Sequence, residues 1–409
     1  SGLNDQQRLS AWVAASIGHA RLIIGTRSAI FTPLPDLGMI IVDEEHDGSY
    51  KQQESFRYNA RDLALVRSQK ENLPVVLGSA TPSLETLHNV NRSRFQIHYL
   101  KPRARAQSKT KLQLLDMCSQ PMQEGLSAAL LDKVAQHLQL GNQVILFINR
   151  RGFSPLLMCH HCGWTIRCKR CDANMTYHKH KHQLHCHHCG AETRSPTSCG
   201  DCGSEELVAI GSGTERIENF LSEHFPDTHI NRIDRDTTRR KGALEDKLQQ
   251  AHAGGASILV GTQMLAKGHD FPNVTLVGIL DTDQALYSAD FRAAEHLAQL
   301  VIQVAGRAGR AEKPGEVLIQ THHPDHPMLG MLAGKNYNLI SDVLLQEPKE
   351  ACLPPFSNLA LLRAEAADYN MPQQFLQQAK EMVAHWDIPD VEFMGPVPAP
   401  MERRAGRYR

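Results

Sequence analysis

Three carboxylates and a histidine follow directly on an apolar run near the start of the chain. The run is Met39 to Val42, and Asp43, Glu44, Glu45 and His46 come next. Such a run predicts a buried parallel strand that ends at the carboxyl edge of a sheet, where open α/β folds bind ligands. There one carboxylate can hold Mg²⁺ while its neighbour orients a water molecule for attack on a phosphate. This acidic motif predicts ATP hydrolysis, although strands followed by acidic residues also occur in proteins without that activity.

Eight of the ten cysteines form Cys-x-x-Cys pairs, which are Cys159/Cys162, Cys168/Cys171, Cys186/Cys189 and Cys199/Cys202. They lie in a segment with few aliphatic residues, which needs another source of stability. Four thiolates complete the tetrahedral coordination of zinc, so the pairs predict two structural zinc sites with no open catalytic position. We expect a nested arrangement, with the middle two pairs forming one site and the outer two the other. Sequential pairing is the alternative.

Two segments beside the acidic motif have the composition of a nucleic-acid surface. Small residues at a strand end, next to an arginine, let backbone N–H groups approach a phosphate. Aromatic residues interleaved with basic ones suit base stacking and phosphate binding. An ordinary turn and a loop that covers the sheet are the alternatives. The candidates for binding DNA in these segments are Thr26, Arg27, Ser28, Tyr50, Phe56, Arg57, Tyr58 and Arg61.

A second set of candidates lies in the later part of the chain. Thr262 to Asp270 follows a buried strand, and Gln303, Arg307 and Arg310 lie on one expected helix. The two arginines are three residues apart, so they share a helical face and can reach one phosphate cluster. A surface salt bridge is the alternative for the arginine pair.

Alternating strands and helices must position these residues. Apolar runs predict strands over Arg21–Gly25, Pro74–Gly78, Val144–Ile148, Ser257–Val260 and Val274–Leu280. Helical periodicity predicts helices near 61–69 and 127–140. Beyond residue 336, a helix over 339–345, a strand over 359–363 and a helix near 373–386 predict a small α+β domain. The fold class is therefore α/β, with a cysteine-rich insertion and an α+β end.

Composition sets limits on the class of protein. Lys and Arg number 44, as do Asp and Glu, so any nucleic-acid surface must be local. We expect a soluble protein without a secretion signal, because no apolar run is long enough to span a membrane. Paired cysteines in such a chain favour zinc in a reducing compartment, which predicts a cytoplasmic location.

Taken together and in this order, the motifs resemble those of superfamily 2 helicases. The resembling segments are Gly25-Thr26-Arg27-Ser28, Asp43-Glu44-Glu45-His46, Ser79-Ala80-Thr81, Thr262 to Asp270, and Gln303 to Arg310. The aromatic-rich loop, the cysteine insertion and the segment Asp290-Phe291-Arg292-Ala293-Ala294-Glu295 narrow the resemblance to bacterial primosomal replication-restart DNA helicases. The resemblance implies two RecA-like lobes that close on ATP, the first of them partial here.

Site roles follow from the resemblance. It implies that Asp43 coordinates Mg²⁺, that Glu44 orients the lytic water, and that Arg307 and Arg310 reach the γ-phosphate. It places Thr26, Arg27 and Thr262 on the DNA backbone, and makes Ser79 and Thr81 the link between hydrolysis and lobe movement. The nucleotide contacts that we expect are Glu45, His46, Gly268, Asp270 and Gln303.

The phosphate loop of the family, Gly-x-x-x-x-Gly-Lys-Ser/Thr, is absent from this sequence. We therefore expect a fragment that hydrolyses ATP poorly or not at all, preceded in the whole protein by a DNA-binding region and a winged helix. The predicted organisation is a partial first lobe (1–100), a basic linker (101–111), a second lobe (112–158 and 204–335) interrupted by the zinc insertion (159–203), and a C-terminal domain (336–409).

The resemblance also implies partners and a place of action. We expect a monomeric, nucleoid-associated 3′–5′ helicase that acts on forked, single-stranded and duplex DNA and has no membrane contact. Its expected protein partners are single-stranded-DNA-binding protein, other primosome proteins and the replicative helicase; its cofactors are two zinc ions, ATP and Mg²⁺. A non-enzymatic zinc-containing scaffold is one alternative. An RNA helicase or a transcription-type zinc-ribbon protein is another.

Overall fold

A computed structural model describes residues 3–53, 56–100, 110–117, 122–149, 156–159, 164, 166–170, 175–178, 183–186, 189, 191–205, 207–210, 213–234, 237–238, 240, 242–252, 254–266, 271–286, 290–309, 313–334, 337–386, 388–399 and 401–409. The chain divides into two compact units. One comprises residues 1–149 and 227–357, and the other residues 150–226 and 358–409.

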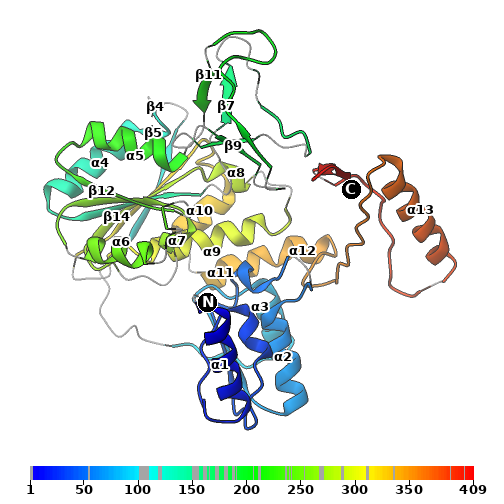
Figure 1. Ribbon diagram of the computed structural model, residues 1–409. Helices are drawn as coiled ribbons and strands as arrows, with labels where there is room; N and C mark the ends of the chain where they lie inside the picture. Colours follow the sequence, from blue (N-terminus) through cyan, green and yellow to red (C-terminus); the bar gives the residue numbers. More distant parts are fainter. Residues whose placement is uncertain are drawn as a thin grey trace. The chain divides into compact units, whose positions relative to one another are not determined.

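A six-stranded parallel sheet forms the centre of the first unit (Figure 1). Every residue of the strands at 143–148, 257–261 and 274–280 is buried, as expected for parallel strands covered on both faces. The predictions of strands at these places are confirmed. In spatial order the strands are β12 (His229–Ile233), β13 (Ser257–Gly261), β6 (Gln143–Ile148), β14 (Val274–Leu280), β15 (Glu316–Thr321) and β3 (Lys111–Asp116).

Helices cover both faces of this sheet. The side chain of Ser127 caps α4 (Ala128–Gln139), which packs on β6 and β14 from one face. On the other face lie α6 (Ala243–His252), α7 (Gln263–Ala266) and α9 (Ala293–Ala305) (Figure 1). This placement follows from the right-handed connections between parallel strands. The remaining elements of this part are α8 (Asp283–Leu286), α10 (Pro327–Gly334), α11 (Tyr337–Leu344), α12 (Gln346–Glu350) and the hairpin β4 (Met122–Gln123) and β5 (Leu126–Ser127).

The same unit contains a smaller group of elements from the first hundred residues. Two parallel strands, β1 (Ile40–Asp43) and β2 (Val75–Gly78), lie beside α1 (Asp5–Ser16), α2 (Ala60–Glu71) and α3 (Leu84–Asn91). Short 3-10 helices span η1 (Arg27–Phe31) and η2 (Gly48–Tyr50). The predicted strand over residues 21–25 is wrong. Among the described strands none pairs with it, and Ile24 is 89% exposed.

The second unit begins with the cysteine-rich segment, which folds as a five-stranded antiparallel sheet. Leu184 and Cys186 are fully buried in its small core. The helix α5 (Gly213–His224) follows the last strand. In spatial order the strands are β10 (Glu192–Arg194), β9 (Gln183–His185), β8 (Thr176–His178), β7 (Leu156–Cys159) and β11 (Leu207–Ile210).

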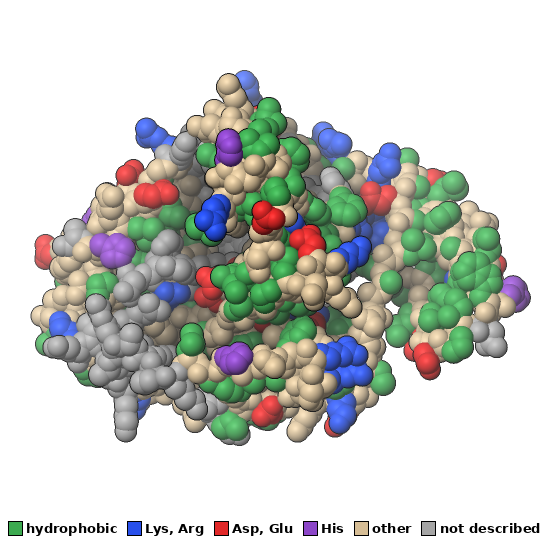
Figure 2. Space-filling view, turned by 90° about the horizontal axis from the view of Figure 1, so that it is seen from below, with side chains coloured by type: hydrophobic (Ala, Val, Ile, Leu, Met, Phe, Trp, Pro, Cys, Tyr) green, Lys and Arg blue, Asp and Glu red, His purple; other side chains and the backbone are tan. Residues whose placement is uncertain are grey.

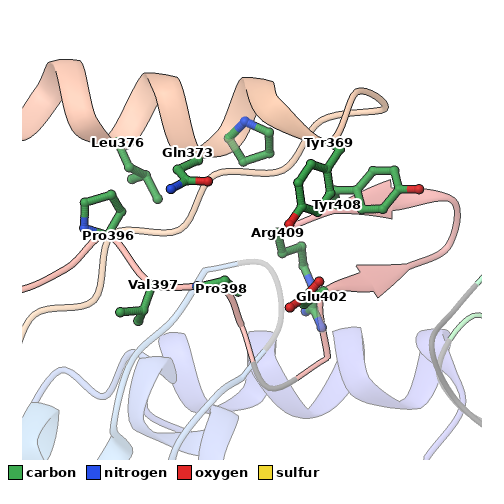
Figure 3. A pocket seen from close by; sticks show the side chains of 10 residues that line it. Tyr369, Gln373, Leu376, Pro396, Val397, Pro398, Glu402, Tyr408 and Arg409 are labelled. Carbon is green, nitrogen blue, oxygen red and sulfur yellow. The ribbon is translucent and has the colours of Figure 1, made fainter.

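The C-terminal part of this unit contains α13 (Asn370–Ala384) and the hairpin β16 (Arg403–Arg404) and β17 (Arg407–Tyr408). The predicted helix is confirmed, but the predicted strand over 359–363 is wrong. It has no pairing partner among the described strands, and Leu361 is 71% exposed. A mainly apolar pocket lies between the helix and the hairpin segment, with Leu376 and Val397 on its walls (Figure 3).

Surface charge is mixed. On the face shown in Figure 2, basic and acidic side chains of the described residues alternate without one sign dominating, in keeping with their equal numbers. A helix of the length and apolar character needed to cross a membrane does not occur in the described part of the chain.

Candidate functional site

The acidic motif lies at the carboxyl end of β1, as predicted. The prediction that this strand is buried is wrong, because within β1 only Val42 is buried and Ile41 is 69% exposed. Asp43 pairs in register with Gly78 of the parallel strand β2, so the residues after both strands meet at one edge. Glu44 adopts a left-handed backbone conformation with φ of 48°, and its N–H donates to Asp43 Oδ1 at 3.0 Å. Its side chain remains 46% exposed. The strand end therefore presents two adjacent carboxyl groups, with Glu44 accessible to solvent.

His46 connects the two strand ends to a helix more than 240 residues away in the sequence. Its Nδ1 lies 2.7 Å from Ser79 Oγ and 3.6 Å from Glu44 Oε2. The side-chain amide of Gln303, on α9, contacts His46 Nε2 and also lies 3.4 Å from Thr81 Oγ1. An Nε2 that accepts from Gln303 leaves the proton on Nδ1, which then donates to Ser79. Predicted site residues from both halves of the chain thus meet here.

Glu45 and Arg61 point into the protein. Glu45 is 2% exposed and accepts hydrogen bonds from Ser83 N at 2.7 Å and Ser83 Oγ at 3.0 Å. Arg61 Nη1 donates to Glu45 Oε2 at 3.2 Å and to Ser83 Oγ at 2.7 Å. Burial lowers the pKa of Arg61, but the carboxylates of Asp62 and Glu45 raise it above its usual value. The side chains of Glu45 and Arg61 therefore hold the acidic motif to the start of α3. Nucleotide binding by Glu45 and DNA binding by Arg61 stay predictions.

The loop after the acidic motif is held against β1 by two side chains. Tyr50 Oη donates to the backbone oxygen of Asp43 at 2.7 Å, and burial, followed by the charge of Asp43, raises the pKa of Tyr50. Arg27 Nη1 donates to the backbone oxygens of Ser49 and Lys51 at 2.9 and 3.2 Å. Movement of this loop would therefore displace the backbone of Asp43 and the side chain of Arg27, to which the loop is hydrogen-bonded.

The other residues predicted to bind DNA differ in exposure. Thr26 and Ser28 are exposed beside η1, and Phe56 and Arg57 are exposed in the loop. Tyr58 packs edge-on against Phe31 with a centroid distance of 4.9 Å. The exposed side chains are available to a ligand. The ring of Tyr58 is partly covered by its contact with Phe31.

In the second half, the structure describes some predicted residues and not others. The prediction that Arg307 lies on one helix with Gln303 is wrong, because α9 ends at Ala305 and Arg307 lies in the turn that follows. Arg307 is 7% exposed, and Thr262 is half-buried just after β13. The predicted residues Arg310, Gly268 and Asp270 lie outside the described residues. Their roles stay predictions.

Several residues to which the sequence analysis gave no role complete the contact between α3 and the later part of the chain. Arg292 and Glu295 at the start of α9 bond to Glu85 and to the N–H of Leu84. Tyr337 Oη donates to the backbone oxygen of Pro82 at 2.8 Å. The segment Asp290 to Glu295 was part of the resemblance, but nothing in its spacing indicated what it contacts.

Three cysteines of the zinc segment converge. The thiols of Cys168, Cys186 and Cys189 lie within 4.8 Å of one another, and the sulfurs of Cys168 and Cys189 are 3.7 Å apart. Tetrahedral zinc with bonds of about 2.3 Å places its sulfur ligands about 3.8 Å apart, so these thiols fit the ion. The grouping is that of the inner site in the nested arrangement. Cys162 and Cys171 lie outside the described residues, and only the backbone of Cys159 is described.

The outer pair that the structure describes also has the geometry of a metal knuckle. The backbone N–H groups of Asp201 and Cys202 donate to Cys199 Sγ at 3.3 and 3.4 Å. Arg170 N–H makes the same kind of bond to Cys168 Sγ at 3.4 Å. Such bonds stabilise a thiolate and orient it as a ligand. The protein therefore has the donor set for zinc in this segment.

Three parts of the chain match models of known protein families. Residues 168–194 match the family model of the PriA DNA helicase Cys-rich region domain, residues 205–312 that of the helicase conserved C-terminal domain, and residues 349–409 that of the primosomal protein N C-terminal domain. Among solved structures, the match to RecG bound to a three-way DNA junction covers 85% of this chain and 36% of the RecG chain, at 13% sequence identity. Its TM-score of 0.43 is too low to support the family assignment.

Curated relatives match along the whole chain. Replication restart protein PriA of Haemophilus influenzae is 50% identical over 100% of this chain and 56% of its own length. Replication restart protein PriA of Bacillus subtilis is 40% identical over 100% of this chain and 51% of its own length. This chain thus spans about half the length of these relatives. With its α/β helicase core, cysteine-rich zinc insertion and C-terminal domain, the chain belongs to the PriA family of replication restart proteins.

Proposed function

We propose that this chain is the helicase core of an ATP-dependent 3′–5′ DNA helicase that unwinds stalled replication forks and helps to assemble the primosome. The observation that supports this most directly is the contact of Gln303 with His46 and Thr81. It joins the acidic motif, the Ser-Ala-Thr segment and α9, which leads into the turn with Arg307; these three segments must act together when two lobes close on a nucleotide.

The proposed roles follow from charge and position. Asp43 holds Mg²⁺ and Glu44 orients the attacking water, because a carboxylate at a strand end suits both tasks. Arg307 and Arg310 stabilise negative charge on the γ-phosphate from the second lobe. Gly268, Asp270 and Gln303 contact the nucleotide. When bound, ATP supplies the phosphoanhydride bond, and Mg²⁺ neutralises charge on its oxygens.

We propose that DNA lies across both lobes. Thr26, Arg27 and Thr262 hold its backbone, and the exposed Phe56 and Arg57 contact bases and phosphates. Tyr50 and Arg27 both anchor the loop that carries these residues, so a strand bound there would act on the backbone of Asp43. We propose the same partners as the sequence implied: single-stranded-DNA-binding protein, other primosome proteins and the replicative helicase.

The test of this proposal is Glu44→Gln in the full-length protein. Loss of the carboxylate that orients water should lower kcat for DNA-stimulated ATP hydrolysis by about 100-fold or more, with little change in binding of Mg²⁺–ATP. Steady-state hydrolysis with and without forked DNA measures this. Glu71→Gln is the matched control, because Glu71 lies in the same part of the fold but pairs only with Arg67 at 2.7 Å among the contacts described for it.

Unchanged turnover in Glu44→Gln would show that the role assignment is wrong. Absence of hydrolysis in the unaltered full-length protein would favour the non-enzymatic scaffold. Equal or greater unwinding of RNA duplexes than of forked DNA would favour the RNA helicase alternative.

A further inference from the structure

The start of α9 is bound to the start of α3, and the sequence predicts that these two helices lie in different lobes. Arg292 forms an ion pair with Glu85 in the first turn of α3. The N–H of Leu84 donates to Glu295 Oε1 at 2.9 Å, and Arg292 Nη1 lies 3.4 Å from Glu295 Oε2. We call Glu85, Arg292 and Glu295 the α3–α9 latch. None of the three has a role in the proposed chemistry.

The latch is the first part of a row of contacts along α9. Gln299 Nε2 lies 3.2 Å from Glu295 Oε1 and 3.4 Å from the backbone oxygen of Thr81. Residues 292, 295, 299 and 303 are spaced three or four apart, so their side chains share one face of the helix. The row ends at Gln303, which contacts His46 and Thr81. The same rigid helix therefore carries the latch at one end and the nucleotide-site residues at the other.

The N-terminus of α3 is held by carboxylates from both lobes. Ser83 N donates to Glu45 of the first lobe at 2.7 Å, and the next N–H, that of Leu84, donates to Glu295 of the second. Carboxylates are favoured at this end of a helix by its dipole. α3 begins just after Ser79-Ala80-Thr81, the segment expected to respond to hydrolysis. Fixing its first turn therefore fixes that segment relative to α9.

The side chains of the latch are buried or partly buried and are specifically paired. Glu295 is 4% exposed, and the side chains of Glu85 and Arg292 are 21% and 32% exposed. Burial raises the pKa of Glu85, but Arg292 lowers it below its usual value, so Glu85 stays ionised. Among the described residues, Glu45, Glu85 and Glu295 lie beside Arg61 and Arg292. Reversing either charge of the Glu85–Arg292 pair would place like charges next to each other, and would therefore oppose lobe closure as well as remove an attraction.

We propose that Arg292 and Glu295 are positioning residues for ATP hydrolysis, which lock α3 to α9 when the lobes close and so bring Gln303 and Arg307 to the acidic motif. They act through α9 and contact no nucleotide themselves. The effect on turnover rests on the proposed ATPase function, but the effect on lobe closure does not.

The test is a charge exchange in the full-length protein. Arg292→Glu and Glu85→Arg should each lower kcat for DNA-stimulated ATP hydrolysis by about 10- to 100-fold, because small displacements of catalytic groups cost rates of this size. The double variant should recover part of the loss, since the pair with residue 85 is restored with opposite polarity while the attraction between residue 292 and Glu295 is not. Glu295→Ala should lower kcat, whereas Glu295→Gln keeps an acceptor for Leu84 N–H and should not.

Lobe closure is measured separately from turnover. Dyes on click-reactive amino acids at the exposed positions Lys70 of α2 and Asp246 of α6 report the distance between lobes, and avoid labelling the cysteines. With a non-hydrolysable ATP analogue, Mg²⁺ and single-stranded DNA, the unaltered protein should give one short distance. Each single reversal should shift the population to longer distances, and the double variant should restore the short one.

Lys133→Glu is the matched control, because Lys133 and Glu316 form an ion pair of similar exposure within the second lobe, 37% and 29%. It should leave turnover and distance unchanged. Single reversals that lower turnover without changing the distance, or a double variant that restores neither, would overturn the proposal. If no form of the protein hydrolyses ATP but the distances respond as expected, the latch stands and the proposed ATPase function fails.

Discussion

Neighbouring glutamates in this protein have different environments, and therefore different chemistry. Glu44 is exposed enough to meet a water molecule and a ligand. Glu45, the next residue, is buried and bound to Ser83 and Arg61. Glu295 is buried beside two further carboxylates, and burial, followed by the charge of Glu85, raises its pKa to about 7. A side chain of one type thus serves as a candidate catalyst, a structural anchor and a carboxyl group that titrates near neutrality.

The raised pKa of Glu295 makes stability depend on pH. Because the usual pKa is near 4.5, the folded protein keeps a proton that the unfolded chain releases between about pH 4.5 and 7, and stability falls as pH rises through that window. Glu295→Gln is neutral throughout. Thermal melts of both full-length proteins measure this. The free energy of unfolding of Glu295→Gln, relative to that of the unaltered protein, should increase by about 3 kcal/mol between pH 5 and pH 8, the value for a fully buried carboxyl group.

The groups facing Glu295 are Arg292, Glu85, Glu45 and Tyr337, and burial raises the pKa of Tyr337, so it stays protonated in this range. Glu316→Gln serves as a control for general effects of charge. Burial raises the pKa of Glu316, but Lys133 lowers it below its usual value, so this carboxyl group stays ionised between pH 5 and 8. A melting difference between Glu295→Gln and the unaltered protein that does not change with pH would contradict the expectation.

Individual secondary-structure elements connect groups of functional residues that lie far apart. α9 extends from the contact with α3 to Gln303, and Arg307 follows its last turn. In the cysteine-rich sheet, β8 and β9 separate the knuckle at Cys168 from the one at Cys186 and Cys189, so that antiparallel pairing returns the chain to the first knuckle. Strand pairing and metal binding then support each other in a segment whose core is small.

The grouping of cysteines predicts how zinc is lost. The nested arrangement places Cys168 and Cys186 in one site, so the double variant Cys168→Ser/Cys186→Ser should reduce zinc from about two ions per chain to about one. Sequential pairing would place them in different sites and remove both ions. Metal analysis of the purified full-length protein distinguishes the two, and Cys352→Ser, an exposed cysteine outside the pairs, should retain both ions.

At the scale of the whole molecule, we propose that the chain supplies two of the three walls of a nucleotide site. In this proposal the acidic motif forms one wall, and Gln303 with the turn after α9 forms the other. Sequence matches to curated relatives cover 51% to 56% of their length. The 409 residues contain no phosphate loop of the form Gly-x-x-x-x-Gly-Lys-Ser/Thr, whose N–H groups and lysine bind the β- and γ-phosphates.

We therefore predict that residues 1–409 alone hydrolyse ATP at least about 100-fold less efficiently than the full-length protein, because the preorganised donors for the phosphates are missing. Turnover of purified, zinc-loaded protein with saturating single-stranded DNA measures this. Circular dichroism and zinc content verify that the shorter protein is folded. Similar efficiencies in the two proteins would contradict the prediction.

Local sequence placed part of the candidate site on its elements, but it extended the helix of Gln303 to Arg307, which lies beyond the end of α9. The apolar runs at 144–148, 257–260 and 274–280 predicted buried strands, because strands covered on both faces have no polar alternation. The acidic motif was correctly placed at the end of β1. Two predicted strands, 21–25 and 359–363, were wrong, because a strand exists only where another strand completes its hydrogen bonds, and a single segment does not reveal its partner.

What the sequence determined by itself was the set of reactive residues, their order and the family that they indicate, since these depend on residue type and short spacing. Tertiary structure alone decided that Glu45 points inward while the side chain of Glu44 stays partly exposed, and that Arg27 holds a backbone loop. It also decided that Glu295 bonds to Leu84 across 211 residues of sequence. Such contacts depend on which distant segments the packing brings together, and neither periodicity nor motif spacing carries that information.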